Sequence, residues 1–406
     1  FETYLASSKP DVLVDATPGA GKTFFGLRVI HHELQSGAAE QVLIVVPSEN
    51  LRKQWATEAA RFGIHLTTNY DAAFSLASDY HGVVTTYQTI SARMNGDNAF
   101  RKYTSRHNTL GVLDEIHHIG ESNNWGEAIK SAMSPCMRRL IITGTPFRSD
   151  RNMIPFVDYA RTDDGGFVCV PDFQYGYGDA LRDGVVRHVY FQTFDGDVSW
   201  FSNDGQFIEA DFGTELNQRQ SAERLRMTMN PNGEWLRKVI TDASQRLDEM
   251  RKDDPTAGGL IVTRDVAHAK QVACVVADVT GKTPTVVTSD EIDSAAQIDA
   301  YRNDNSEWIV AVKMVSEGVD IRRLRVGVWA TNTQTELFFR QVVGRIVRIA
   351  ERPEDQYAYQ YIPKLEPLTT YANRMKEERS HVVDDLDSID DLLQRERTDR
   401  SNGQTS

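Results

Sequence analysis

The feature that most constrains this 406-residue chain is the segment DVLVDATPGAGKTFFGLRVI near its start. An apolar run typical of a buried strand leads into a glycine-rich loop, and a helix-like stretch follows. The loop matches the pattern G-x-x-x-x-G-K-[ST], with Ala16 in place of the opening glycine. Backbone N–H groups in such a loop, at the N-terminus of a helix, bind phosphate groups. The predicted phosphate-binding residues are Thr17, Pro18, Gly19, Ala20, Gly21, Lys22 and Thr23.

A second candidate site is the segment TLGVLDEIHHIG, in which Asp114 and Glu115 end an apolar run that is typical of a strand. Asp114 would hold Mg²⁺, usually through water, and Glu115 would orient and deprotonate an attacking water. Lys22 and Thr23 fit the same chemistry, because the lysine would reach the β- and γ-phosphates and the threonine would ligate Mg²⁺. Two acids at a strand end can also be solvated charge, but their combination with the loop favours a catalytic role.

Short β-rich runs alternate with longer amphipathic segments along most of the chain. The runs DVLVDA, QVLIVV, GVVTT, LGVLD and RRLIIT form one series, and GGLIVT, TPTVV, EWIVAV and RVGVWA form another. This alternation predicts an α/β fold with parallel sheets covered by helices on both faces. We predict an α/β domain at residues 1–150, a Gly-, Asp- and Tyr-rich linker at 151–185, a second α/β domain at 186–365, and a charged, partly disordered tail at 366–406. A cleft is expected between the domains.

The formal net charge of −13 argues against a protein that coats nucleic acid electrostatically, although it leaves room for a local basic cleft. Part of the acidity lies in residues 381–406, which hold seven acids against three arginines. Such a segment is typical of a solvated, disordered tail. The chain has no apolar run of the roughly 18 residues that a membrane helix needs, so no membrane partner is expected.

The cysteines and histidines indicate neither a disulfide framework nor a metal centre. Cys136, Cys169 and Cys274 are odd in number and far apart, which favours a reducing, cytoplasmic compartment. His117 and His118 have no acidic or histidine partner at ligand spacing, so coupling within the phosphate site is favoured. The chain opens with FETYLASSKP rather than Met, like the end of a helix already under way, and a segment upstream is expected.

The order of the GAGKT loop and the tetrapeptide DEIH resembles the DExH-type helicases and translocases of superfamily 2. The resemblance spans residues 11–350 and implies two RecA-like P-loop domains, with ATP and Mg²⁺ bound in the cleft between them. Further segments resemble the family's motifs in the family's order: VVPSENLRKQW (Ia), TTYQTI (Ib), TGTPFR (III), LIVTRD (IV), MVSEGVDI (V) and QVVGRIVR (VI). The glutamine that opens motif VI and the TGT of motif III look more like XPB-like DNA helicases and the motor subunits of type I and III restriction enzymes than like DEAD-box RNA unwinders.

Motifs V and VI imply contributions to the ATP site from the second domain. Gln341, Arg345 and Arg348 are spaced by four and three residues, so on a helix they would share one face. The resemblance implies that these arginines neutralise charge on the γ-phosphate. It also implies that Gly318 and Asp320 lie between the nucleotide and a bound strand. Solvated arginines on a surface helix are the alternative interpretation.

The resemblance further implies residues that hold nucleic acid by its backbone. They are Pro47, Arg52, Thr85, Thr86, Thr263, Arg264 and Ser316. Each motif also has a simpler interpretation. Ser48 and Thr86 would cap helices in any case, motif III hydroxyls would satisfy a turn, and LIVTRD would be an ordinary strand-to-helix turn.

Taken as a whole, the resemblance implies a nucleic-acid-dependent ATPase that acts as an ATP-driven DNA helicase or translocase. A motor that pumps duplex DNA without separating its strands, as in restriction, remodelling or defence complexes, and an RNA helicase are the alternatives. A clamp with a vestigial ATPase and an ATPase acting on proteins fit the motifs less well. No nuclease constellation is recognisable in the sequence, so a protein partner or a missing segment would supply any nuclease function, and partners could also supply targeting.

Overall fold

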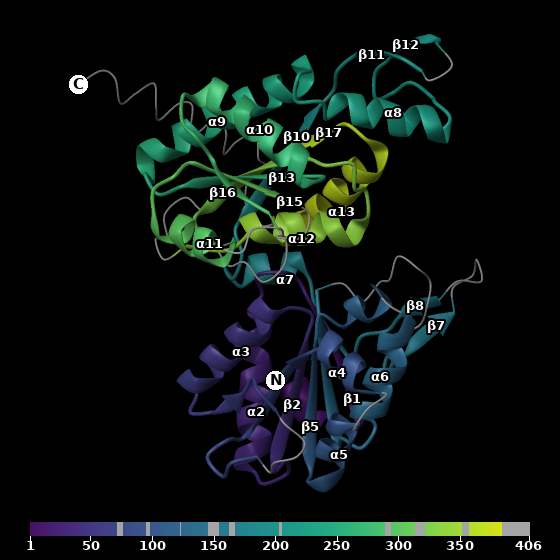
Figure 1. Ribbon diagram of the computed structural model, residues 1–406, viewed down its shortest axis with the longest axis vertical. Helices are drawn as coiled ribbons and strands as arrows, with labels where there is room; N and C mark the ends of the chain where they lie inside the picture. The colour runs from purple at the N-terminus through teal and green to yellow at the C-terminus, as the bar shows by residue number, and fades with distance from the viewer. Residues whose placement is uncertain are drawn as a thin grey trace.

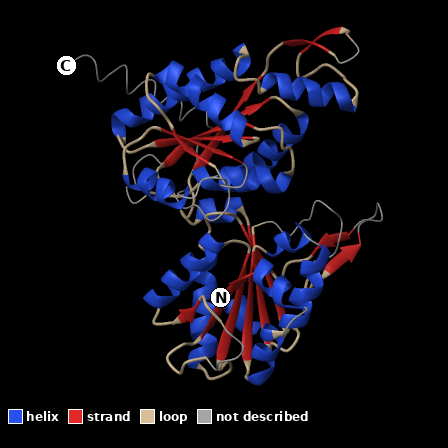
Figure 2. Cartoon of the chain, viewed as in Figure 1, coloured by secondary structure: helices blue, strands red, loops and turns tan. Residues whose placement is uncertain are grey.

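The computed structural model describes residues 1–70, 76–94, 98–121, 123–144, 154–161, 167–202, 205–288, 294–312, 321–350 and 357–383. They form two α/β domains, each built on a parallel sheet with helices packed around it (Figure 2). The two domains lie one above the other, with the N-terminal domain below in the view of Figure 1. Within these ranges, no helix is both long enough and apolar enough to cross a membrane.

The first domain is built on a seven-stranded sheet with the order β3-β4-β2-β5-β6-β1-β9. All its strand pairs are parallel. Its strands are β1 (Asp11–Ala16), β2 (Gln41–Val46), β3 (Leu66–Thr67), β4 (Gly82–Thr86), β5 (Thr109–Asp114), β6 (Arg138–Thr143) and β9 (Phe173–Tyr175), with the small pair β7 (Tyr159–Arg161) and β8 (Phe167–Cys169) beside them. Its helices are α1 (Glu2–Ala6), α2 (Lys22–Gln35), α3 (Glu49–Arg61), α4 (Tyr87–Met94), α5 (Ala99–Arg106), the 3-10 helix η1 (Ile116–Glu121) and α6 (Asn123–Met133).

Alternating side chains along the strands fill two separate cores, one on each face of this sheet. In β1, Val12 and Val14 belong to the core that contains residues of α2 and α3, whereas Leu13 belongs to the core that contains residues of α4, α5 and α6. This division follows from the two-residue period of a strand. Burial on both faces explains why the strands are apolar throughout, as the sequence predicted. Because these strands are parallel, the carboxyl ends of β1, β5 and β6 lie at one edge of the sheet.

The second domain is built on a six-stranded parallel sheet with the order β10-β17-β16-β13-β15-β14. Its strands are β10 (His188–Phe194), β13 (Gly258–Thr263), β14 (Thr285–Val287), β15 (Trp308–Val312), β16 (Leu324–Ala330) and β17 (Tyr357–Pro363). Its helices are α7 (Tyr177–Arg182), α8 (Gln218–Thr228), α9 (Glu234–Asp253), α10 (Val266–Thr280), α11 (Ser294–Asn303), α12 (Glu336–Ile346) and α13 (Glu366–Val383). Helices α7, α12 and α13 lie on the side of this domain that faces the first domain (Figure 1).

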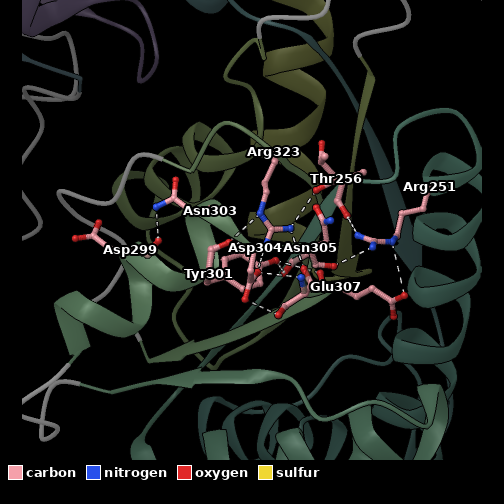
Figure 3. A network of polar contacts seen from close by, with 12 residues as sticks. Arg251, Thr256, Asp299, Tyr301, Asn303, Asp304, Asn305, Glu307 and Arg323 are labelled. Carbon is pink, nitrogen blue, oxygen red and sulfur yellow. Dashed lines mark hydrogen bonds and ion pairs between the residues drawn. The ribbon is translucent and has the colours of Figure 1, made fainter.

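A polar network ties together the amino ends of three of these strands (Figure 3). Arg323, just before β16, is buried and donates hydrogen bonds to the carbonyl groups of Tyr301, Thr256 and Ser306 at 2.6–3.1 Å. Its guanidinium also lies 3.8 Å from the centre of the Tyr301 ring. Because the functional residues of parallel sheets lie at the carboxyl ends of strands, this network has a structural role at the opposite edge.

Two of the predicted boundaries are wrong. The segment 151–185, predicted as a linker, contributes β9 to the first sheet beside β1, and α7 to the core of the second domain. Residues 366–383, predicted as part of a charged, partly disordered tail outside the second domain, form helix α13. Leu368, Ala372 and Met375 of this helix are buried in the second core. Residues 384–406 lie outside the described residues.

A hairpin and a helix form an appendage that the sequence did not indicate. Strands β11 (Val198–Phe201) and β12 (Phe207–Ala210) pair antiparallel, and α8 packs against them. Trp200 is buried and donates to Glu223 of α8 at 3.0 Å, while Phe201 and Phe207 face solvent as a cross-strand pair. The hairpin lies at the end of the second domain far from the first domain (Figure 1).

Candidate active site

The glycine-rich loop of residues 17–23 connects β1 to α2 at the carboxyl edge of the first sheet. Gly19 and Gly21 have φ angles of +89° and +80°, a backbone region that side chains disfavour, and Gly21 caps the N-terminus of α2. The loop is anchored at its start, because the Thr17 N–H donates to the Tyr175 carbonyl of β9 at 2.9 Å. Helix α2 begins at Lys22, so Lys22 and Thr23 lie in its first turn, as a phosphate site requires.

The two acids lie at the end of β5, opposite this loop. Glu115 has a φ of 50°, which is unusual for a side-chain-bearing residue and turns it out of the strand direction. Its carboxylate pairs with the Lys22 ammonium and accepts hydrogen bonds from the Gly144 N–H at 3.2 Å and the Thr143 hydroxyl at 3.4 Å. Residues from the glycine-rich loop, the DEIH segment and the start of motif III therefore meet at one carboxylate. Residues 145–148 of motif III lie outside the described residues.

Asp114 and Glu115 have pKa values shifted in opposite directions. Burial and the neighbouring Glu115 charge raise the pKa of Asp114, with Lys22 opposing them. Burial would also raise the pKa of Glu115, but the charges of Lys22 and His117 outweigh it and lower that pKa below its usual value. Glu115 is therefore the more acidic of the two carboxyl groups and is ionised at neutral pH. An ionised carboxylate held by hydrogen bonds can accept a proton from a water placed against it.

The residues present also fit a magnesium ion. Asp114 offers a carboxylate and Thr23 a hydroxyl, and hard cations such as Mg²⁺ prefer oxygen ligands. Thr23 follows directly on Lys22, whose side chain reaches the residue after Asp114, so the two oxygen donors come from converging segments.

Helix α12 of the second domain packs directly on the glycine-rich loop. A Cβ built on Gly344 would overlap the Cβ of Pro18, so only glycine permits this approach. The Gln341 amide nitrogen lies 3.4 Å from the His117 Nε2, and the His117 Nδ1 lies 3.2 Å from the Thr143 hydroxyl. His117 thus lies beside Thr143 and Glu115 and connects these residues to the second domain.

Arg348 does not share a helix face with Gln341 and Arg345, contrary to the prediction. Helix α12 ends at Ile346, and Arg348 forms an isolated bridge with Val186 just before β10. Its backbone carbonyl accepts a hydrogen bond from the buried Arg187 side chain. The stem of Arg348 still reaches the loop, because a Cβ on Gly19 would lie 3.5 Å from its Cγ. Arg345 lies in the last turn of α12.

A polar cavity of about 350 Å³ lies beside the loop, between the domains. Asp15, Thr17 and Gly144 line it from the first domain, and Arg340 and Glu378 line it from the second. Burial raises the pKa of the Asp15 carboxyl to about 6, with partial compensation from the charges of Arg340 and Lys22. Arg340 is held by Glu336 at 3.2 Å and by Glu378 at 3.1 Å. The predicted cleft between the domains is therefore present.

The residues predicted to hold nucleic acid do not all lie at one place in the structure. Pro47 lies between β2 and α3, where Ser48 caps α3 by accepting a hydrogen bond from the Leu51 N–H at 3.3 Å. Arg52 donates to the Thr68 carbonyl at 3.2 Å and pairs with Glu49. These contacts hold the start of α3 within the domain.

The threonines of motifs Ib and IV are turned into the domains. Thr85 is buried in β4, and Thr86 caps α4, with its hydroxyl 3.2 Å from the Thr89 N–H. Thr263 is fully buried, and its hydroxyl donates to the Ala311 carbonyl at 3.0 Å, so this hydroxyl faces the interior of the domain. Arg264 pairs with Asp265, which caps α10. Ser316, Gly318 and Asp320 lie outside the described residues.

Three residues of this region were not singled out in the sequence. Trp55 donates its indole N–H to Asp114, and Asp15 and Arg340 line the cavity. Asp15 directly precedes the glycine-rich pattern, and Arg340 directly precedes motif VI. For Asp15 the sequence did contain a signal, because it is a charged residue that interrupts an apolar run. The contact of Trp55 depends on the packing of α3 against α2 and β5, which no local pattern reveals.

The sequence of the first domain matches a known family, and close relatives exist. Residues 2–148 match the family described as "Type III restriction enzyme, res subunit". The uncharacterized protein ML1624 of Mycobacterium leprae is 42% identical over 381 residues, covering 94% of this chain and 63% of the relative. The endonuclease subunit of the Escherichia coli type I restriction enzyme EcoAI is 22% identical over 365 residues, covering 84% of this chain and 42% of the relative. The chain thus spans less than two thirds of the length of these relatives.

Solved structures share the two-domain fold. A fragment of a putative HsdR subunit of a type I restriction enzyme from Vibrio vulnificus YJ016 has a TM-score of 0.59 at 15% identity, covering 90% of this chain and 62% of that chain. The restriction-modification enzyme LlaBIII bound to DNA has a TM-score of 0.58 at 15% identity, covering 94% of this chain and 29% of that chain. Mss116p bound to single-stranded RNA and AMP-PNP has a TM-score of 0.56 at 12% identity, covering 93% of this chain and 70% of that chain. The chain therefore has the fold of restriction-enzyme HsdR subunits and DEAD-box helicases, and its first domain matches the restriction-enzyme res subunits in sequence, as the resemblance to superfamily 2 predicted.

Proposed function

We propose that this chain is the motor of an ATP-driven DNA translocase or helicase. The observation that carries the proposal is the junction at Glu115, where Lys22, Gly144 and, through His117, Gln341 of the other domain meet. A carboxylate that is connected to the other domain through one histidine suits a reaction that depends on the relative position of the domains. ATP hydrolysis would then be completed when α12 is seated on the glycine-rich loop.

The chain's own residues account for each part of the chemistry. Lys22 has two alternative anionic partners, the Glu115 carboxylate and the phosphates of a bound nucleotide. When Lys22 pairs with phosphate, Glu115 becomes available to take a proton from the attacking water. Asp114 and Thr23 would hold Mg²⁺, which neutralises phosphate charge when bound. Arg345 and Arg348 would add positive charge from the second domain.

DNA is the proposed nucleic acid because the family that matches the first domain and one of the sequence relatives are restriction-enzyme subunits. In such a motor, backbone contacts would grip the DNA without reading its sequence. Protein partners, or parts of a longer protein, would supply nuclease or targeting functions. Cys136, Cys169 and Cys274 are free thiols, which supports a reducing cytoplasm as its place of action.

Steady-state ATP hydrolysis with single-stranded DNA, duplex DNA and RNA tests this proposal. DNA should stimulate turnover, and Lys22→Ala and Glu115→Gln should abolish it while the protein stays folded. Absence of stimulation by every nucleic acid, with Lys22→Ala still reducing the basal rate, would favour an ATPase that acts on another substrate. Turnover in the wild type equal to that of Glu115→Gln would indicate a vestigial ATPase.

A motor that moves along duplex without separating it is the second candidate, because the family match is to restriction-enzyme res subunits. Stimulation by duplex DNA combined with no release of a labelled strand would establish this candidate. Strand release from a tailed duplex would establish a helicase. Stimulation by RNA alone would identify an RNA helicase instead.

A further inference from the structure

A tryptophan of the first domain is hydrogen-bonded to a residue that would hold magnesium. The indole N–H of Trp55, on α3, donates to Oδ2 of Asp114 at 2.8 Å. Trp55 is completely buried and Asp114 is 4% exposed. A hydrogen bond to a charged acceptor in such surroundings is stronger than one exposed to water. Because the bond fixes one carboxylate oxygen, the carboxylate cannot rotate about its Cβ–Cγ bond without breaking it.

The ring that carries this N–H is itself held by the helix that follows the phosphate-binding loop. A Cβ placed on Gly26 of α2 would lie 2.6 Å from Cη2 of Trp55 and 3.0 Å from Cδ1 of Ile142. Only a glycine at this position leaves room for the indole. Trp55 therefore bridges α3, α2 and the end of β5, and its ring cannot shift towards α2.

A second aromatic residue fixes the backbone of the same acid. The Tyr87 hydroxyl, at the start of α4, donates to the Asp114 carbonyl at 2.9 Å, and Tyr87 is also completely buried. The Tyr87 ring stacks on Trp125, with ring centroids 6.3 Å apart and planes at 17°. Asp114 is thus held at its main chain by Tyr87 and at its side chain by Trp55. Only the second of these bonds determines how the carboxylate is oriented.

We propose that Trp55 is a positioning residue for magnesium, which holds the Asp114 carboxylate in the orientation that the metal requires. The inference rests on the proposed function, since it takes Asp114 as a ligand of Mg²⁺. Groups that orient a metal ligand commonly change metal affinity tenfold or more when they are removed. Because α3 follows directly on Pro47 and Ser48, the same bond joins a segment proposed to meet nucleic acid to the metal site.

Nucleotide binding with and without metal tests this role separately from turnover. The probe is a fluorescent ATP analogue, titrated into the full chain in EDTA and in Mg²⁺. In the wild type, Mg²⁺ should increase the affinity. Trp55→Phe keeps an aromatic ring but loses the N–H, so it should reduce this increase about tenfold while the affinity in EDTA stays unchanged. Raising the Mg²⁺ concentration should restore binding.

Trp329→Phe is the matched control. Trp329 is also completely buried, and its Nε1 has no hydrogen-bond partner among the residues that the structure describes. This variant loses the same N–H without losing a bond to Asp114, and should bind the analogue as the wild type does. An equal Mg²⁺-dependent increase in Trp55→Phe and wild type would overturn the positioning role. Absence of any Mg²⁺ dependence in the wild type would overturn the proposed magnesium site and this inference with it.

A measurement on the unaltered protein covers the case in which Trp55→Phe does not fold. With ¹⁵N-labelled tryptophan, the indole N–H groups of the six tryptophans are observed by NMR. Paramagnetic Mn²⁺ added with ADP should broaden an indole N–H resonance at a low metal-to-protein ratio, because the Trp55 N–H lies against a metal ligand. If no indole resonance broadens when Mn²⁺ and ADP bind, the inference is wrong.

Discussion

The Gln341 side-chain nitrogen of α12 lies 3.4 Å from the His117 Nε2 of η1, so the two domains meet at this pair. His117 faces the Thr143 hydroxyl at 3.2 Å and the Glu115 carboxylate at 3.5 Å with its other ring nitrogen. A single imidazole ring therefore separates the second domain from the carboxylate proposed to activate water.

Gln341→Ala should lower the DNA-stimulated kcat about tenfold or more while the KM for ATP changes little, because the lost contact orients groups that act on the reacting water. His117→Ala should have a similar effect. If the two residues act through one another, the double variant should be no worse than the slower single variant. Steady-state ATPase measurements on all three variants check this. Independent multiplication of the two effects would mean that the contact is not used in turnover.

Gly344→Ala should prevent α12 from seating on the glycine-rich loop, since the added Cβ would overlap Pro18. Alanine is favoured over glycine in a helix by about 1 kcal/mol, so α12 itself is not weakened. We expect stimulated kcat to fall at least about tenfold, a barrier increase of roughly 1.4 kcal/mol. Gly126→Ala in α6 is the control, because among the described residues its Cβ would meet only Ile119 Cγ2 at 3.7 Å, and it should retain activity. Equal activity of both variants would contradict the predicted seating.

Asp15 should make folding stability fall as the pH rises from about 4 to above 6. Its folded pKa of about 6 lies above the ordinary 3.8, so the folded state binds the proton more tightly and ionisation at higher pH costs up to about 3 kcal/mol. The positive groups Arg340 and Lys22 and the acids Glu115 and Glu378 act on it from both domains. Asp15→Asn removes the ionisation, so its stability relative to wild type should increase between pH 5 and pH 7.5. Urea unfolding at both pH values checks this, and a pH-independent difference would refute it.

Arg323→Met should destabilise the second domain by roughly 3 kcal/mol, because buried carbonyl groups lose their donor and Asp304 loses its ion pair. Arg323→Lys should recover only part of this loss, since an ammonium group cannot match the guanidinium's several directed donors. The midpoint of urea unfolding measures both. Nucleotide binding by the first domain should be unchanged, and a loss of binding without a loss of stability would assign Arg323 a different role.

The parts of the fold that sequence predicted are those specified by local patterns. Apolar strands such as residues 12–14 and 110–113 are buried on both faces, so their position in a parallel sheet is evident from composition alone. Lys22 and Glu115 meet because parallel strands end at a common edge. Helix α13 also had a signal: Leu368, Ala372 and Met375 recur at the spacing of one helix face, but the high charge of the segment indicated a tail instead.

Other features depend on contacts between distant segments. Strand β9 has three residues and no apolar run of its own, and it is a strand because β1 leaves an open edge beside it. Arg348 fits helical spacing from Arg345, yet α12 ends before it, because the chain turns to pair with Val186. Thr263 is polar, yet it is buried, and its hydroxyl is satisfied by donating a hydrogen bond to the Ala311 carbonyl. Tertiary packing overrides local propensity at each of these positions.

The passage from one domain to the other is very short. Strand β9 ends at Tyr175 in the first sheet, and α7, which belongs to the second core, starts at Tyr177, so Gly176 is the one residue between these two elements. The Tyr175 carbonyl accepts a hydrogen bond from Thr17, the first residue of the phosphate-binding loop. The covalent connection between the domains therefore adjoins the loop proposed to bind nucleotide. In the proposed motor, a change in the orientation of the domains would be a rotation about Gly176, and the largest displacement would occur at the end of the second domain farthest from that residue.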